Sequence, residues 1–152
     1  MHIYVMTEVI GIDHIYITVS DLERSAAFYD LVLIDTLSFQ RNSITLGGEP
    51  HVQYFNRHFS YVLRPSRIFK GHNAHAPGLH HFCFRVESIA DVVTVANQLR
   101  VLGVEASEAK LYTEYALDYW ATFFTDPDGV FLEVTNYREE RRDRYDNWKS
   151  EG

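Results

Sequence analysis

The sequence predicts an α+β fold made of two βαβββ modules, and three observations point to it. The phrases "GIDHIYITVSDLE" and "GLHHFCFRVESIA" repeat one pattern 67 positions apart. In each phrase, apolar and polar residues alternate as in a half-buried strand, and helical periodicity follows. Shorter apolar runs separated by Gly, Pro and Asp come after each helix, which is typical of further strands joined by turns.

The first module is expected to cover about residues 10–65. Alternation from Ile12 to Val19 predicts its opening strand. Ser20, with Glu23 three residues later, predicts a capping box at the start of a helix over 22–33. The runs "HVQYFN" and "FSYVLRP" predict later strands of this module, and a Gly-Gly pair ahead of them predicts a turn.

The second module is expected to cover about residues 78–136 and repeats the first. Its opening strand is predicted over 81–86. Ser88 and Asp91 stand at the two positions of a capping box, which predicts a helix over 90–102 that ends before a glycine. The runs "YWATFF" and "VFLEVTN" predict strands on either side of a "DPDG" turn.

The remaining segments are expected to connect or extend the modules within a single domain over 1–152. Residues 66–77, rich in Gly, Ala, Pro and His, are expected to form a surface linker. Residues 137–152 form a tail dense in charge, and we expect a solvated helix there.

The composition excludes several classes of partner. A chain of 152 residues with 46% hydrophobic content is long and apolar enough to bury a core. Its formal charge of −7 argues against nucleic acid or an anionic membrane as a partner. The single cysteine, Cys83, and a start without the features of a secretory signal predict a cytoplasmic protein. We therefore expect a small-molecule substrate.

Alternation also predicts where the polar side chains of the strands lie. In the opening strand, His14 shares a face with Tyr16 and Thr18, whereas the isoleucines share the other face. His81 likewise shares a face with Cys83 and Arg85. The apolar faces must pack against the helices, so the polar faces are expected to line a concavity. Glu133, inside the apolar run "VFLEVTN", needs a partner because a buried unpaired carboxylate is costly.

These residues resemble the vicinal oxygen chelate superfamily, which includes glyoxalase I, extradiol dioxygenases, fosfomycin-resistance thiol transferases and bleomycin-binding proteins. The resemblance covers about residues 10–136 and is carried by "DHIYITVSDLERSAAFY", "GLHHFCFRV" and "DPDGVFLEV". It implies a glyoxalase-like fold in which paired βαβββ modules form a half-open sheet cup. It also implies a divalent metal ion, matched residue by residue to His14, His81 and Glu133.

The ligand chemistry agrees with this resemblance. Two imidazoles and one carboxylate leave open positions on Mn, Fe, Ni, Co or Zn for two substrate oxygens. Each histidine alone is better explained as an ordinary strand residue, and the complete set reverses that preference. His80 is the rival ligand, but alternation predicts that it lies on the opposite side of the strand from His81.

The type of reaction stays open among lyase, transferase and dioxygenase. Glyoxalase I resembles this chain but uses a further Glu in the first module, and no Asp or Glu occurs between His51 and Val86. Extradiol dioxygenases have a Tyr where this chain has Phe123, and a His that is absent here. The alternative function is a metal-free drug- or metabolite-binding protein of the bleomycin-resistance type, which the 14% aromatic content favours.

Residues near the mouth of the expected cup are predicted to bind substrate. Tyrosines would contact it, and arginines would orient an anionic group through paired hydrogen bonds. The predicted set is Tyr61, Arg64, Arg85, Tyr115 and Tyr119. The resemblance also implies that modules can be exchanged between two chains. We expect a homodimer, in which His14 of one chain meets His81 and Glu133 of the other.

Overall fold

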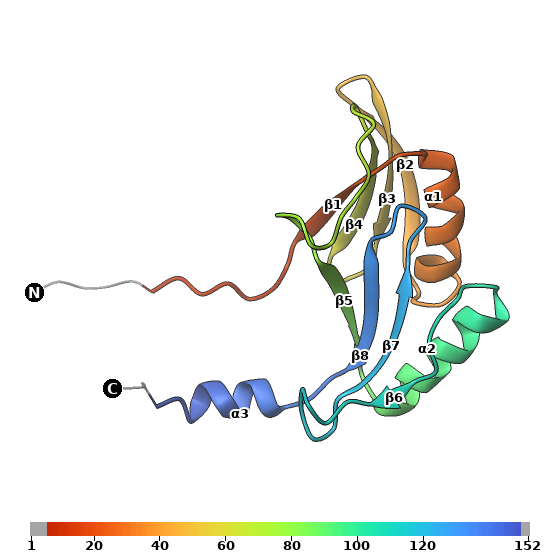
Figure 1. The fold of residues 1–152 in the computed structure, drawn as a ribbon. Helices are drawn as coiled ribbons and strands as arrows, with labels where there is room; N and C mark the ends of the chain where they lie inside the picture. The colour runs from red at the N-terminus through yellow and green to blue at the C-terminus, as the bar shows by residue number, and fades with distance from the viewer. Residues whose placement is uncertain (1–5, 150–152) are drawn as a thin grey trace, which may run out of the picture. The chain divides into compact units, whose positions relative to one another are not determined.

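The computed structural model describes residues 6–149, which form two compact units that divide between Lys70 and Gly71. Each unit is one βαβββ module with its own mixed sheet, so the predicted α+β, glyoxalase-like fold is confirmed (Figure 1). None of the helices within these residues is long and apolar enough to cross a membrane.

The first unit contains a sheet in the order β1-β4-β3-β2. Strand β1 is parallel to β4, and the other neighbours are antiparallel. Tyrosines from the helix and two strands fill the core between helix and sheet, where Tyr29 and Tyr61 join their hydroxyls at 2.9 Å. The elements are β1 (His14–Val19), α1 (Leu22–Tyr29), the π-helix η1 (Asp30–Ile34), β2 (Gln40–Leu46), β3 (Glu49–Phe55) and β4 (Ser60–Pro65).

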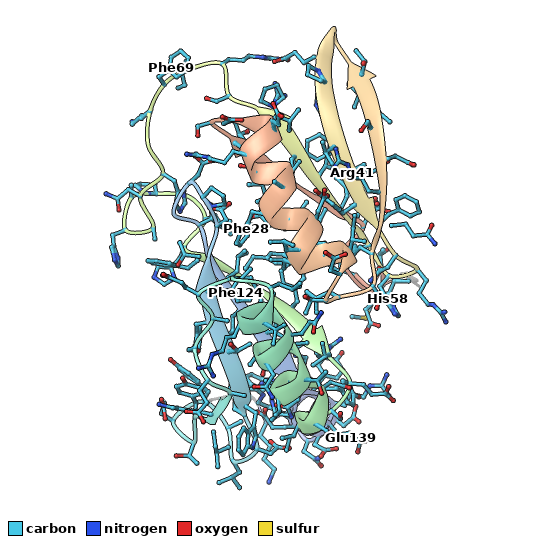
Figure 2. The ribbon with its side chains drawn as sticks, turned by 90° about the vertical axis from the view of Figure 1, so that its right-hand side faces the viewer. Phe28, Arg41, His58, Phe69, Phe124 and Glu139 are labelled. Atoms are coloured by element: carbon cyan, nitrogen blue, oxygen red, sulfur yellow. The ribbon has the colours of Figure 1, made fainter. Side chains whose placement is uncertain are left out.

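The second unit repeats this order as β5-β8-β7-β6 and adds a helix after the sheet. Helix α2 packs against β7 and β8, and Figure 2 shows it crossing in front of these strands. Its apolar side, including Val92 and Leu99, is fully buried. The elements are β5 (His81–Val86), α2 (Ile89–Val101), β6 (Lys110–Leu111), β7 (Trp120–Thr125), β8 (Phe131–Asn136) and α3 (Glu140–Asp146).

The start of α1 differs from the prediction. Asp21, not Ser20, caps this helix, and its carboxylate accepts from the Arg24 amide at 3.0 Å. Ser20 instead accepts a hydrogen bond from the Arg24 guanidinium at 2.9 Å. The predicted capping box of α2 is present, with Ser88 and Asp91 bonded reciprocally at 3.1 Å.

The end of the first helix also differs, because a π-helical turn follows Tyr29 where a continuous α-helix over 22–33 was predicted. The amide of Asp35 bonds to the carbonyl of Asp30 at 3.0 Å, five residues back. The Tyr54 hydroxyl donates to the Asp30 carboxylate at 2.7 Å and lies 3.1 Å from the Ala26 carbonyl oxygen. Tyr54 of β3 thus bonds to the helix where the α-helical turns end and the π-helical turn begins.

Candidate metal and substrate site

Strand register brings the polar residues of the second sheet together on one face. Parallel pairing of β5 with β8 aligns Cys83 with Glu133. Antiparallel pairing of β8 with β7 aligns Glu133 with Phe123. Because neighbours in register share a face, Glu133 lies beside both side chains, while Leu132 and Val134 are buried on the opposite face. The sheet therefore places the Glu133 carboxylate between a thiol and an aromatic ring on the face that also carries His81.

The carboxylate of Glu133 has two protein partners, although the sequence revealed none. Only 4% of the residue is exposed. The Tyr119 hydroxyl donates a hydrogen bond to Oε2, and Nε2 of His81 lies 3.6 Å from Oε1. Tyr119 comes from the segment that leads into β7 and was predicted to contact substrate. In the structure, Tyr119 contacts the Glu133 carboxylate.

His81 is held from its other side by His80. The two Nδ1 atoms are 2.8 Å apart and share a hydrogen, which leaves Nε2 of His81 directed towards Glu133. The prediction that His80 lies on the opposite side is wrong, because β5 begins only at His81 and strand alternation does not extend to the residue before it. His80 instead fixes which ring nitrogen His81 presents.

His14, in the first unit, has the same kind of partner. Its Nδ1 lies 2.6 Å from the carboxylate of Asp13, the preceding residue, and its side chain is 55% exposed. In both modules the residue before the strand therefore engages Nδ1 and leaves Nε2 available. Among residues 6–149, no three His, Cys, Asp or Glu side chains are close enough to hold one metal ion. The joining of His14 to His81 and Glu133 stays a prediction.

Two neighbours of the carboxylate are kept in their neutral forms. Burial, together with the charge of Glu133, raises the pKa of the Cys83 thiol. Burial and the hydrogen bond to Glu133 also raise the pKa of the Tyr119 hydroxyl. Cys83 is therefore a thiol at neutral pH, and Tyr119 is a hydrogen-bond donor.

A pocket of about 1170 Å³ opens beside His81 and Glu133, entirely within the second unit. Tyr115 and Tyr119 line it with their rings 5.1 Å apart. Phe123, Phe131 and His80 add further rings. Phe131 precedes Glu133 by two residues and so shares its face, a placement that alternation in "VFLEVTN" could have predicted. The structure thus brings together His81, Glu133, Tyr115 and Tyr119 from the predicted set.

The two predicted substrate contacts of the first unit, Tyr61 and Arg64, lie on opposite faces of β4. Tyr61 is fully buried in the core, where its hydroxyl meets that of Tyr29. Arg64 lies on the opposite face of β4 and bonds to Glu49 at 2.9 Å. The two residues stand at an odd spacing and cannot share one face of a strand. The prediction that Tyr61 contacts substrate is wrong, because its side chain is buried in the core, whereas the contact predicted for Arg64 stays a prediction.

Arg85 keeps its predicted place on the face of β5 that carries His81 and Cys83, but it does not line the large pocket. Its guanidinium lies 5.2 Å from the centre of the Tyr137 ring. A second, smaller pocket includes it together with residues that follow β8.

The chain is similar to known proteins over most of its length. Residues 11–134 match the model of the Glyoxalase/Bleomycin resistance protein/Dioxygenase superfamily. The uncharacterized protein YwkD of Bacillus subtilis (strain 168) is 32% identical over 129 residues, covering 82% of this chain and 94% of that protein.

Solved structures agree in fold. A glyoxylase/bleomycin resistance protein/dioxygenase domain from Frankia sp. EAN1pec aligns with a TM-score of 0.70 at 23% identity, covering 86% of this chain and all 100% of that one. Lactoylglutathione lyase from Agrobacterium tumefaciens aligns with a TM-score of 0.63 at 19% identity, covering 86% and 96%. The chain therefore belongs to the Glyoxalase/Bleomycin resistance protein/Dioxygenase superfamily.

Proposed function

We propose that the protein is a divalent-metal-dependent enzyme that acts on a small molecule with adjacent oxygens. The observation that carries this proposal is the buried carboxylate of Glu133, which faces Nε2 of His81 at 3.6 Å beside a large pocket. A buried charge needs compensation. Tyr119 supplies a hydrogen bond but no charge, and a cation bound by the carboxylate together with Nε2 of His81 would compensate its charge.

The donor atoms suit the proposed ion. Imidazole nitrogens and a carboxylate are ligands of Mn, Fe, Co, Ni and Zn. His81, Glu133 and, by the family pattern, His14 would hold the ion. When bound, such an ion supplies Lewis-acid polarisation of substrate oxygens.

The other residues of the site prepare these ligands. The Tyr119 hydroxyl holds one oxygen of Glu133 and leaves the other towards His81. His80 orients the His81 ring through the shared hydrogen between their Nδ1 atoms. The rings of Phe123 and Phe131 add apolar surface to the lining of the pocket. These roles serve lyase, transferase and dioxygenase chemistry alike.

Metal analysis of protein purified without an affinity tag tests the proposal directly. We expect close to one equivalent of Mn, Fe, Co, Ni or Zn per chain, and loss of that metal in the His81→Ala variant. His72→Ala, a change of the same kind in an exposed segment, should keep the metal. Metal-free protein that also fails to bind any of these ions when they are added would refute the enzyme proposal.

A metal-free binding protein is the second candidate, and the aromatic lining of the pocket favours it. Tyr115 and Tyr119 present tilted rings 5.1 Å apart, and Phe123 contributes another. Such a surface suits a flat apolar ligand. If a ligand found by screening bound chelator-treated protein as tightly as metal-loaded protein, this second function would replace the first.

We further propose that the protein is a homodimer in which the modules are exchanged. His14→Ala and Glu133→Ala chains, each unable to bind metal, would be unfolded together and refolded as a mixture. A site shared between chains leaves one intact site in each mixed dimer, so bound metal should return. A site within one chain stays broken in both partners. Mixed dimers without metal would contradict the exchange and leave the three ligands unaffected.

The cellular setting belongs to the proposal as well. The single cysteine favours a cytoplasmic setting, and the net charge of −7 favours small-molecule substrates over nucleic acid or membrane partners.

A further inference from the structure

A second pocket in the second unit is surrounded by arginines. Its volume is about 40 Å³, which exceeds the volume that a single water molecule requires. Strand β5 contributes Arg85, the segment after β8 contributes Arg138, and α3 contributes Arg141, Arg144 and Glu140. The chain as a whole carries −7. This pocket therefore concentrates positive charge in an acidic protein, and we call it the arginine pocket.

Most of this charge has no carboxylate partner. Arg144 pairs with Glu140 at 3.3 Å. Arg138 donates from Nη1 to the uncharged oxygens of Thr135 and Asn136, at 2.9 and 2.7 Å. Its Nε is buried with no hydrogen-bond partner in the described part of the chain.

Arg85 and Arg141 likewise form no ion pair with a carboxylate among the described residues. Arg85 stacks over the Tyr137 ring at 5.2 Å, and within residues 6–149 no carboxylate lies within ion-pair distance of either residue. Like charges gathered in this way repel one another. An oxyanion would relieve the repulsion and accept the forked hydrogen bonds that guanidinium groups donate.

The arginine pocket is connected to the candidate metal site by the sheet. Arg85 lies four residues after His81 on the same face of β5, a distance of about 13 Å along the strand. The Arg138 guanidinium lies 4.2 Å from the centre of the Tyr119 ring, and the Tyr119 hydroxyl bonds to Glu133. One aromatic residue therefore contacts a pocket arginine on its ring and the candidate ligand through its hydroxyl.

We infer that the arginine pocket binds the phosphate or carboxylate group of the substrate whose other end reaches His81 and Glu133. This inference rests on the proposed function and narrows its substrate class to elongated anions. The anionic end supplies binding and orientation at Arg85, Arg138 and Arg141, about one strand length from the oxygens that would be polarised.

The test uses the full chain without added metal, titrated calorimetrically with inorganic phosphate and, in a separate arm, with acetate. We expect saturable phosphate binding at millimolar concentration that weakens as salt is added. Acetate binding through the same residues would identify a carboxylate as the natural group. Arg85→Gln and Arg141→Gln should each weaken binding about tenfold, the effect of losing one charge-assisted hydrogen bond.

Arg142→Gln is the matched control, because it removes the same charge from the same helix and does not line the pocket. It should change phosphate binding less than twofold. No saturable binding, or an equal loss in Arg142→Gln, would overturn the inference. The titration contains no metal, so it measures phosphate binding independently of metal binding. Phosphate binding without any metal binding would therefore refute the proposed enzyme and leave the anion site standing.

Discussion

The two modules share one topology but differ at the strand position where chemistry is expected. In the first sheet, Tyr16 of β1 lies in register with Val62 of β4. In the second, Cys83 of β5 lies in register with Glu133 of β8. Both positions are buried, with 2% of Val62 and 4% of Glu133 exposed. The equivalent buried strand position thus holds a valine in the first module and a glutamate in the second.

Only the second of the two similar modules places a charged side chain at this buried position, and the two side chains have different requirements. Valine needs only packing, whereas a carboxylate needs compensation. A carboxylate of the first sheet, Glu49, is paired with Arg64 and Arg67. Hydrogen bonding by Arg67, with the charges of both arginines, lowers the pKa of Glu49. Glu133 instead accepts from a neutral tyrosine and faces Nε2 of His81 at 3.6 Å, and among residues 6–149 no arginine or lysine lies within ion-pair distance of it.

Glu133→Gln should abolish this difference between the modules. The amide keeps the size and one acceptor of the side chain but removes the charge that attracts a cation. We expect no metal above background in protein at micromolar concentration, measured by elemental analysis after dialysis. Glu49→Gln makes the same change in the first module and should keep full metal content. Equal metal in both variants would show that Glu133 is not a ligand.

Val62→Glu should reverse the comparison by placing a carboxylate at the matching buried position of the first sheet. Tyr16 lies in register with this position but carries no charge, and Arg64, two residues on, is already paired with Glu49. We therefore expect the free energy of unfolding to fall by about 3 kcal/mol. Urea denaturation followed by circular dichroism measures this. Val62→Thr, similar in volume and uncharged, should lose less. A loss no greater than that of Val62→Thr would contradict the argument that burial of charge separates the modules.

Tyr119→Phe should sharpen the role of the neutral donor. Without the hydroxyl, Oε2 of Glu133 loses its hydrogen bond, and we expect the affinity for Mn²⁺ or Zn²⁺ to fall about tenfold, the low end of the range for partners of metal ligands. Titration calorimetry gives this number. Tyr115→Phe removes a hydroxyl from the same pocket, and it should leave metal affinity unchanged. A change of equal size in Tyr115→Phe would point to a general effect on the pocket.

The smallest expected effect is on stability and concerns the N-terminal caps of α1 and α2. Ser88→Ala should lower the free energy of unfolding by about 1 kcal/mol, because the hydroxyl accepts from the Asp91 amide. Ser20→Ala should cost only a few tenths, since Asp21 already caps α1. Asp21→Ala should then match Ser88→Ala. Chemical denaturation of the three variants in parallel would reveal a reversed order, which would disprove this assignment of the caps.

Local pattern was sufficient wherever the relevant interactions are local. Strand alternation and helix periodicity depend on a few neighbouring residues, so the repeat, the strands β1, β3, β4, β5, β7 and β8 and the capping box of α2 followed from the sequence. Two strands, β2 and β6, were implied by the βαβββ order without being located. Lys110 and Leu111 alone form β6, which is too short for any periodic signal.

Side-chain placement at the ends of elements depended on the fold. His80 stands one residue before β5, where alternation no longer applies, and only the structure shows it beside His81. The π-helical turn after Tyr29 forms where a strand residue, Tyr54, bonds to Asp30 from 24 positions away. Tyr61 is a different case, because its odd spacing from Arg64 already excluded a shared face.

The sequence by itself determined the two modules and the need of Glu133 for a partner, because both follow from residue type and short-range spacing, and its resemblance to known sequences indicated the family. Tertiary structure decided what that partner is. Tyr119 lies 14 residues before Glu133, and only the β7–β8 register brings its hydroxyl to the carboxylate. Hydrogen bonds and ion pairs act over a few ångströms in space. Separation along the chain does not predict which residues come this close in space. The arginine pocket likewise forms only because the fold brings Arg85 of β5 close to the arginines of α3.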